Sequence, residues 1–270
     1  MRILVIGDIF GKTGRKVINE LLPKIRKDFN IDFVIANVEN ATHGKSISEK
    51  HYWNLKSSGI DVMTSGNHIF SLDETREYIN KYDDLLRPLN SNPFHPGNGT
   101  YFTVLNEKKI RVTNLIGNAF MPPADNPYFA LERVLEYDDS DIHIVDFHAE
   151  ATAEKIAFAW YFDGKIEAFY GTHTHVQTAD DRILSKGTAF ITDAGMTGPK
   201  NGIIGADPNC IIKRVKYGFN SKMEPFEDSG QFNGVIFDFN QDDNKVRSIE
   251  RMNFSRENYL KFFKDKFLKN

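Results

Sequence analysis

Cysteine is almost absent from this chain of 270 residues: Cys210 stands alone, so no disulfide can form within the chain. Chains without disulfides are typical of reducing compartments. No apolar run reaches the roughly 18 residues that a transmembrane helix needs. The apolar run at the start is short and ends at Gly7 and Asp8, which is typical of a strand rather than of a signal peptide. We therefore expect a cytoplasmic protein that does not enter a membrane.

Positive charge is also not in excess, because 34 Lys and Arg residues face 37 Asp and Glu residues. A basic surface for duplex nucleic acid is therefore not expected. A nucleotide or a short strand in a metal-bearing cleft stays compatible, since a bound metal adds charge that the sequence does not count. The chain has no linker, repeat or low-complexity tract. We expect a single domain over residues 1–270, with a C-terminal hairpin and a tail helix.

Short apolar runs alternate with amphipathic segments along the chain, which predicts an α/β protein. Strands are predicted at residues 3–6, 32–36, 60–64, 141–147, 166–170 and 189–192, and helices at 11–25, 49–56, 129–137, 151–162, 208–215 and 256–268. Residues 100–116 and 234–251 are expected to form antiparallel hairpins, and residues 193–199 a glycine-rich loop. Ser46 and Ser71 each precede a glutamate by three positions, so each is predicted to cap a helix.

Side chains that can bind metals follow five of the predicted strands. They are Asp8, Glu39 with Asn40, Asn67, His148, and His173 with His175. Ligands of open α/β sheets bind beyond the carboxyl ends of the strands, so we expect these side chains to converge. Two imidazoles as close in sequence as His173 and His175 suit divalent transition metals.

The number of these ligands predicts two metals rather than one. Seven oxygen or nitrogen ligands exceed what one zinc ion takes, and they divide naturally if one carboxylate bridges. Two metals about 3.5–4 Å apart serve in-line displacement at phosphorus, because they generate hydroxide from water and neutralise phosphoryl charge. A ligand set without thiolate favours iron, manganese or zinc over copper. We expect two transition metals, iron first, with manganese or zinc as alternatives.

The order of these motifs resembles that of the calcineurin-like metallophosphoesterases, and most closely that of their YmdB-like phosphodiesterases. The segments that carry the resemblance are Met1-Arg2-Ile3-Leu4 with Gly7-Asp8, Glu39 to Lys45, Gly66-Asn67-His68, Asp146 to Thr152, Gly171 to Asp180, and Gly195 to Pro199. They are spread over nearly the whole chain. The resemblance implies a four-layer α/β/β/α fold, in which two central β-sheets are sandwiched between helices.

The resemblance also implies a role for each ligand. Asp8, Glu39, Asn40 and His175 would hold one metal, Glu39 would bridge, and Asn67, His148 and His173 would complete the second. His68 would be the catalytic residue that stabilises the transition state or protonates the leaving oxygen; support of the neighbouring ligands is its alternative role. His43 and Thr174 are candidate substrate contacts, with an ordinary loop histidine as the alternative reading of His43.

Three positions depart from the pattern of the family. Phe10 stands where the superfamily commonly has histidine, and Asn40 is expected to replace the lost ligand. Glu39 stands where the superfamily has aspartate, and this longer carboxylate is itself a YmdB-like trait that still allows bridging. Phe70 stands where YmdB-like proteins usually have tryptophan, which alters the pocket wall. An arginine expected near Asn118 is absent.

These features together predict a dimetal phosphodiesterase that cleaves by in-line attack of a metal-bound hydroxide. The resemblance suggests cyclic nucleotides, 2′,3′ or 3′,5′, or short RNA-derived diesters as substrates. A phosphomonoesterase or 5′-nucleotidase on the same metals is the nearest alternative. A regulatory protein that binds nucleotide or RNA, with weak activity, is an alternative from another class. A homo-oligomer is expected, although no motif specifies one.

Overall fold

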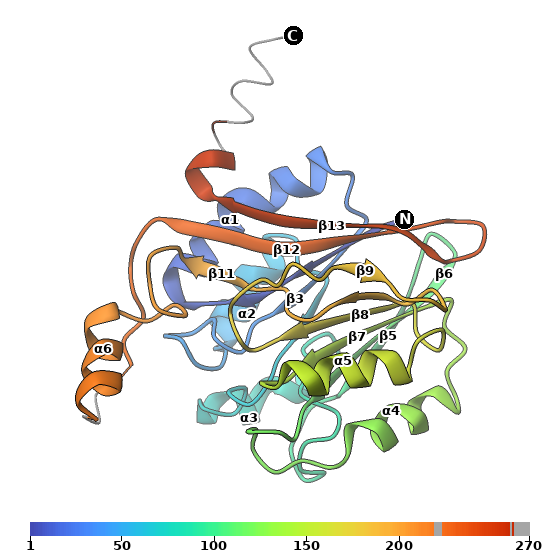
Figure 1. Cartoon of the computed structure of the whole chain (residues 1–270), viewed down its shortest axis with the longest axis horizontal. Helices are drawn as coiled ribbons and strands as arrows, with labels where there is room; N and C mark the ends of the chain where they lie inside the picture. Colours follow the sequence, from blue (N-terminus) through green and yellow to red (C-terminus); the bar gives the residue numbers. More distant parts are fainter. Residues whose placement is uncertain (219–222, 260, 262–270) are drawn as a thin grey trace.

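Two β-sheets pack face to face in this protein, and helices cover the outer face of each (Figure 1). The computed structural model describes residues 1–218, 223–259 and 261. Figure 1 shows α4 and α5 in front of the sheets and α1 and α2 behind them. The predicted four-layer α/β/β/α arrangement is therefore confirmed.

The first sheet has the strand order β2-β11-β12-β1-β3-β4, and β13 pairs with β12. Its strands are β1 (Arg2–Ile6), β2 (Asp8–Ile9), β3 (Phe33–Asn37), β4 (Val62–Thr64), β11 (Met196–Pro199), β12 (Gly230–Phe239) and β13 (Val246–Ser255). β1, β3 and β4 run parallel, so their carboxyl ends meet at one edge of the sheet.

The second sheet has the strand order β5-β6-β7-β8-β10-β9. Its strands are β5 (Thr100–Leu105), β6 (Lys108–Ile116), β7 (Ile142–His148), β8 (Ala168–Thr172), β9 (Arg182–Ile183) and β10 (Ala189–Ile191). β6, β7, β8 and β10 run parallel to one another. The carboxyl ends of β7 and β8 therefore also lie side by side.

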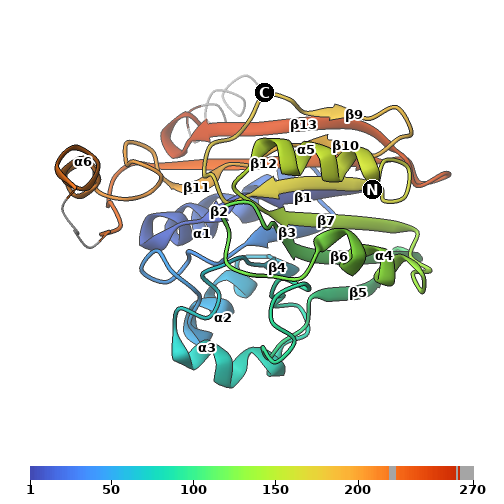
Figure 2. The ribbon, with the colours of Figure 1, turned by 60° about the horizontal axis from the view of Figure 1, so that its bottom comes forward.

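The helices connect these strands. They are α1 (Gly11–Asp28), α2 (Glu49–Ser57), α3 (Asp73–Tyr78), the 3₁₀ helix η1 (Ile79–Lys81), α4 (Pro127–Leu135), α5 (Thr152–Tyr161) and α6 (Pro208–Tyr217). No residue of α6 is buried, and both overall views show this helix standing apart from the sheets (Figures 1 and 2).

Successive side chains of β1 point alternately into two apolar clusters, one on each face of the first sheet. Ile3 and Val5 lie in the apolar cluster between the sheets, together with Ile144 of β7. Leu4 and Ile6 point to the opposite face and pack with α1. A third cluster, rich in phenylalanine, lies between the second sheet and α5. Because both faces of the central strands are covered, these strands are continuously apolar, which made them recognisable in the sequence.

The two predicted helix caps are wrong. Ser48, not Ser46, is the N-cap of α2, where its hydroxyl accepts a backbone N–H of the first turn. The hydroxyl of Ser46 is buried and lies 2.9 Å from that of Thr75. The N-cap position of α3 is Leu72 rather than Ser71, and no side chain in the described part of the chain caps this helix. The side chain of Ser46 therefore contacts Thr75 instead of capping the helix.

Several further elements differ from the expectation or extend it. The predicted loop at 193–199 is a strand in its second half, where β11 pairs with β2 and β12. The short elements β2, β9 and η1 were not predicted. Residues 256–259 and 261 are helical, and the other positions of the predicted tail helix lie outside the described residues. No helix among the described residues is long and apolar enough to cross a membrane.

Candidate metal centre

Asp8 is fully buried where β1 ends and β2 begins. A Cβ on the preceding Gly7 would lie 2.0 Å from the carbonyl oxygen of Gly195, so only glycine allows the residue before β11 to approach this closely. Oδ2 of Asp8 accepts the backbone N–H of His173 at 3.1 Å. Oδ1 is buried and finds no hydrogen-bond partner among the described residues. This oxygen therefore has an open coordination position.

Glu39 and Asn40 lie on the loop that follows β3 and are almost completely buried. Oε2 of Glu39 accepts the backbone N–H of His68 at 2.8 Å, while Oε1 lies 3.1 Å from Nε2 of His148. The amide of Asn40 donates to the carbonyl of Gly44 at 3.1 Å. Its Oδ1 atom is buried and unpaired within the described chain, like Oδ1 of Asp8.

His148 ends β7, and its orientation is fixed by Thr172 of β8. Nδ1 of His148 lies 2.9 Å from the hydroxyl of Thr172, which donates to Asp146 at 2.7 Å. Nε2 therefore points into the site, where it lies 3.1 Å from Oδ1 of Asn67. Such carboxylate-anchored contacts behind an imidazole are typical of metal-binding histidines.

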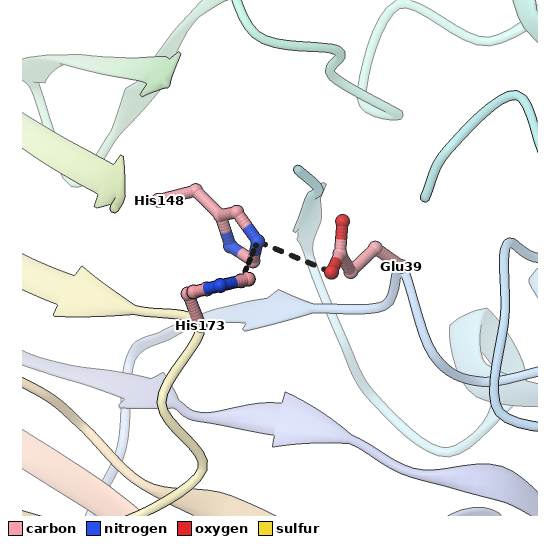
Figure 3. Close-up of side chains that lie close together, drawn as sticks. All are labelled: Glu39, His148 and His173. Atoms are coloured by element: carbon pink, nitrogen blue, oxygen red, sulfur yellow. Dashed lines mark hydrogen bonds and ion pairs between the residues drawn. The ribbon is translucent and has the colours of Figure 1, made fainter. Parts of the chain in front are cut away.

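His173 and His175 follow β8 on a loop with unusual backbone angles, φ of 104° and 65°. Nδ1 of His173 lies 3.0 Å from Nε2 of His148, and its other nitrogen lies 3.1 Å from Glu150 (Figure 3 shows His173, His148 and Glu39). His175 directs Nδ1 to the carbonyl of Ile204 at 2.9 Å, and its Nε2 lies 3.7 Å from Oδ1 of Asp8, too far for a hydrogen bond. The two histidines thus face different members of the cluster.

The electrostatics of the cluster follow from two buried carboxylates facing imidazoles. Burial opposes ionisation of Asp8 and Glu39, but His175 and His148, respectively, lower the pKa of each. Burial also disfavours charge on His148, yet Glu39 raises the pKa of His148 to about 9. Burial, together with the charge of His148, lowers the pKa of His173 to about 4. Despite burial, Asp8 also raises the pKa of His175, so positive charge on His148 and His175 compensates the two carboxylates, a charge that a bound cation would supply instead.

The arrangement fits transition-metal ions. Ligand atoms of Glu39, His148 and His173 lie within 4.8 Å of one another (Figure 3). Asp8 and Asn40 each offer the buried, unpaired oxygen described above, and buried polar atoms are otherwise almost always paired. The donor set of carboxylate, amide and imidazole groups suits iron, manganese or zinc.

A cleft of about 1050 Å³ opens beside the cluster. It is lined by Glu39, Asn40, His173 and His175 from the cluster, by the candidates His43, His68 and Thr174, and by Phe10, Lys45, Glu150 and Arg214 among others. Nδ1 of His68 lies 3.3 Å from Oε1 of Glu39 and 3.1 Å from the amide nitrogen of Asn40. Thr174 lines the cleft, but its hydroxyl donates to Asp193 at 2.8 Å. The seven predicted ligands are thus brought to one place, with His68 beside them.

Two further side chains of the site went unnoticed in the sequence. Glu150 contacts His173, and its position two residues after His148 was the available signal. Lys155 on α5 is fully buried beneath the histidine loop, and a lysine in an amphipathic helix normally indicates a solvent-facing position. Phe10 stands where the superfamily commonly has histidine, and the centre of its ring lies 5.5 Å from that of His175.

This fold, with carboxylates and imidazoles gathered at the carboxyl ends of its strands, defines a protein of the metallophosphoesterase class. The model of a family described as YmdB-like protein matches residues 4–252, and the chain belongs to this family. The chain is 45% identical over 254 residues to a 2′,3′-cyclic-nucleotide 2′-phosphodiesterase of Bacillus subtilis (strain 168), covering 93% of this chain and 96% of that protein. The predicted resemblance is therefore confirmed.

Two crystal structures are similar over almost their whole length. One, described as a novel phosphatase from Mycoplasma pneumoniae, has a TM-score of 0.91 at 39% identity and covers 97% of this chain and 96% of that one. The other, a hypothetical protein from Thermus thermophilus, has a TM-score of 0.90 at 35% identity and covers 94% of this chain and 99% of that one.

Proposed function

We propose that this protein is a metal-dependent phosphodiesterase whose substrates are 2′,3′-cyclic nucleotides. The observation that carries the proposal is the buried cluster of carboxylate, amide and imidazole groups, with two unpaired oxygens, beside a cleft of nucleotide size. The identity of 45% to a 2′,3′-cyclic-nucleotide 2′-phosphodiesterase supports this substrate class. 3′,5′-cyclic nucleotides and short RNA-derived diesters are the substrates to compare with it.

Each ligand has a place in this proposal. Asp8, Glu39, Asn40 and His175 would hold one metal, and Asn67, His148 and His173 would hold the second, with Glu39 placed within reach of both groups. Bound iron, manganese or zinc supplies water activation and neutralises charge on the phosphoryl oxygens. Thr172 and Asp146 hold the ring of His148 so that Nε2 faces the metal position.

His68 takes the part of the catalytic residue. Glu39 and Asn40 lie beside its Nδ1 atom, so Nε2 is the ring nitrogen left for the substrate in the cleft. From there His68 stabilises the negative charge that develops at phosphorus or gives a proton to the leaving oxygen. Hydrolysis at the 2′ ester bond then yields a nucleoside 3′-phosphate.

The test begins with metal-stripped protein to which manganese or iron is restored. We expect hydrolysis of 2′,3′-cyclic AMP to the 3′-phosphate, and faster turnover of bis-p-nitrophenyl phosphate than of p-nitrophenyl phosphate. Asp8→Asn should lower the rate by about 100-fold or more, the scale of groups that organise transition-state charge. Asp139→Asn is the matched control, because Asp139 is an exposed partner of Lys109 on the surface.

The other outcomes each select a different function. Faster turnover of the monoester would favour a phosphomonoesterase or 5′-nucleotidase. Metal binding without turnover of any of these compounds would favour a nucleotide- or RNA-binding regulatory protein. A wild-type protein that binds neither manganese nor iron would refute the proposal.

A further inference from the structure

A fully buried lysine lies under the loop that carries His173 and His175. Nζ of Lys155 donates to the carbonyl oxygen of Thr172 at 2.9 Å and to Oδ2 of Asp193 at 2.8 Å. The side chains of Lys155 and Asp193 are 0% and 1% exposed. Burial of an ion pair is costly unless its remaining donors and acceptors are satisfied. The other partners of Asp193 therefore indicate what this pair does.

Oδ1 of Asp193 accepts the backbone N–H of Gly195 at 2.9 Å, whereas Oδ2 contacts the histidine loop. Oδ2 of Asp193 accepts both the backbone N–H of Thr174, at 3.1 Å, and its hydroxyl, at 2.8 Å. Thr174 stands between His173 and His175, whose φ angles of 104° and 65° are uncommon for residues other than glycine. Such angles persist only where surrounding contacts hold them. Asp193 makes two such contacts at the centre of the loop.

The strand beneath the loop is adapted to the lysine. A Cβ on Gly171 of β8 would lie 2.8 Å from Cδ of Lys155 and 1.9 Å from the carbonyl oxygen of Thr192. A residue larger than glycine at this position would therefore collide with the lysine stem and with the backbone that leads to Asp193. The absence of a side chain at Gly171 lets the lysine reach the loop.

We propose that Lys155, Asp193 and Thr174 form a positioning network that holds His173 and His175 in the geometry that binds metal. The inference rests on the proposed function, because it takes the two histidines to be ligands. The hydrogen bonds of Lys155 within the described residues go to Thr172 and Asp193 and not to a histidine side chain, so it acts through Asp193 and the backbone of Thr174. Because His173 and His175 serve different metals in the proposal, loss of the network weakens both binding steps rather than one.

The decisive variants are Thr174→Val and Thr174→Ser. Valine has the shape of threonine without the hydroxyl, whereas serine keeps the hydroxyl that donates to Asp193. Manganese binding to metal-stripped protein, measured by calorimetry, should weaken by about 10- to 100-fold in Thr174→Val, the usual effect of losing a contact behind a ligand. Thr174→Ser should restore the wild-type affinity. Lys155→Met should weaken binding in the same way as Thr174→Val.

Thr188→Val is the matched control for a loss of stability alone. The hydroxyl of Thr188 is buried and donates to the carbonyl oxygen of Ile166 at 2.6 Å, without contact to the histidine loop. This variant should unfold at a lower temperature and bind manganese like the wild type. Thermal unfolding of all variants separates a lower fraction of folded protein from a lower affinity.

Each possible result either supports or contradicts the positioning network. Wild-type affinity in Thr174→Val, or equal weakening in Thr174→Ser, would overturn the network while leaving the proposed function intact. Weakening of only one of the two binding steps would also contradict it. If Lys155→Met does not fold, the threonine pair still decides. Absence of metal binding in the wild type would instead refute the proposed function, and the network with it.

Discussion

Gly66→Ala tests whether the position of His148 controls the site. A Cβ at Gly66 would lie 2.1 Å from Cδ2 and 2.2 Å from Nε2 of the imidazole. The ring would have to move by about 1.4 Å to reach an ordinary carbon–carbon separation of about 3.5 Å. The ring is fully buried and held 2.9 Å from the hydroxyl of Thr172, so this movement breaks the contact that orients it.

The expected cost has two parts. Overpacking in a closed interior destabilises a protein by about 1–3 kcal/mol. Misplacement of a functional group by about 1 Å lowers activity by about 100-fold. We therefore expect Gly66→Ala to remain folded, to bind manganese more weakly, and to hydrolyse a cyclic nucleotide about 100-fold more slowly.

Gly187→Ala is the control for this variant. Gly187 has a φ of 110°, which strains an alanine, but no described atom lies within 4 Å of its added Cβ. Both variants should therefore unfold at lower urea concentrations, and only Gly66→Ala should lose metal affinity and turnover. Metal titration and steady-state rates separate the two effects. Wild-type affinity and rate in Gly66→Ala would refute the reasoning.

Two further predictions address contacts around the site and in the scaffold. Glu150→Gln removes the charge 3.1 Å from Nε2 of His173, so manganese affinity should fall by about tenfold, whereas the surface variant Glu132→Gln should not change it in the same titration. Burial opposes ionisation of Asp138, but contacts with His143 and Arg111 lower its pKa in the folded protein. Its stabilising effect is therefore complete above about pH 3.9, the pKa of an unfolded aspartate, and is lost progressively as the pH falls from there toward the lowered pKa of the folded protein. Asp138→Asn should therefore cost about 1–2 kcal/mol at pH 7, and the difference from wild type should shrink in urea unfolding at pH 3; a difference independent of pH would contradict this.

The convergence of the candidate ligands was predictable from the sequence because their positions follow from strand topology. Asp8, Glu39 and His148 each follow an apolar run that is buried on both faces. Parallel strands bring their carboxyl ends together, so residues far apart in the sequence meet at one edge. No detail of side-chain packing was needed for this step. The same logic predicted the place of His173, although not its φ of 104°.

The parts that were not predictable depend on contacts between distant segments. Ser46 and Ser48 are equivalent as capping residues, and the contact of Ser46 with Thr75 decides between them. β11 becomes a strand because β2 and β12 lie on either side of it. Lys155 is buried because Gly171 leaves space for it and Asp193 supplies the opposite charge. The local sequence around each of these residues does not reveal such contacts with distant segments.

The division of the ligands between the two sheets has a consequence for the site. Asp8, Glu39, Asn40 and Asn67 follow strands of the first sheet, whereas His148, His173 and His175 follow strands of the second. Close to the cluster, Asp146 of β7 accepts hydrogen bonds from Asn37 and Thr64 of the first sheet. Burial raises the pKa of Asp146 to about 7, and these two donors hold it at the junction. The candidate ligands therefore come together only where the sheets pack correctly, and a metal that bound residues of both sheets would stabilise that packing in return.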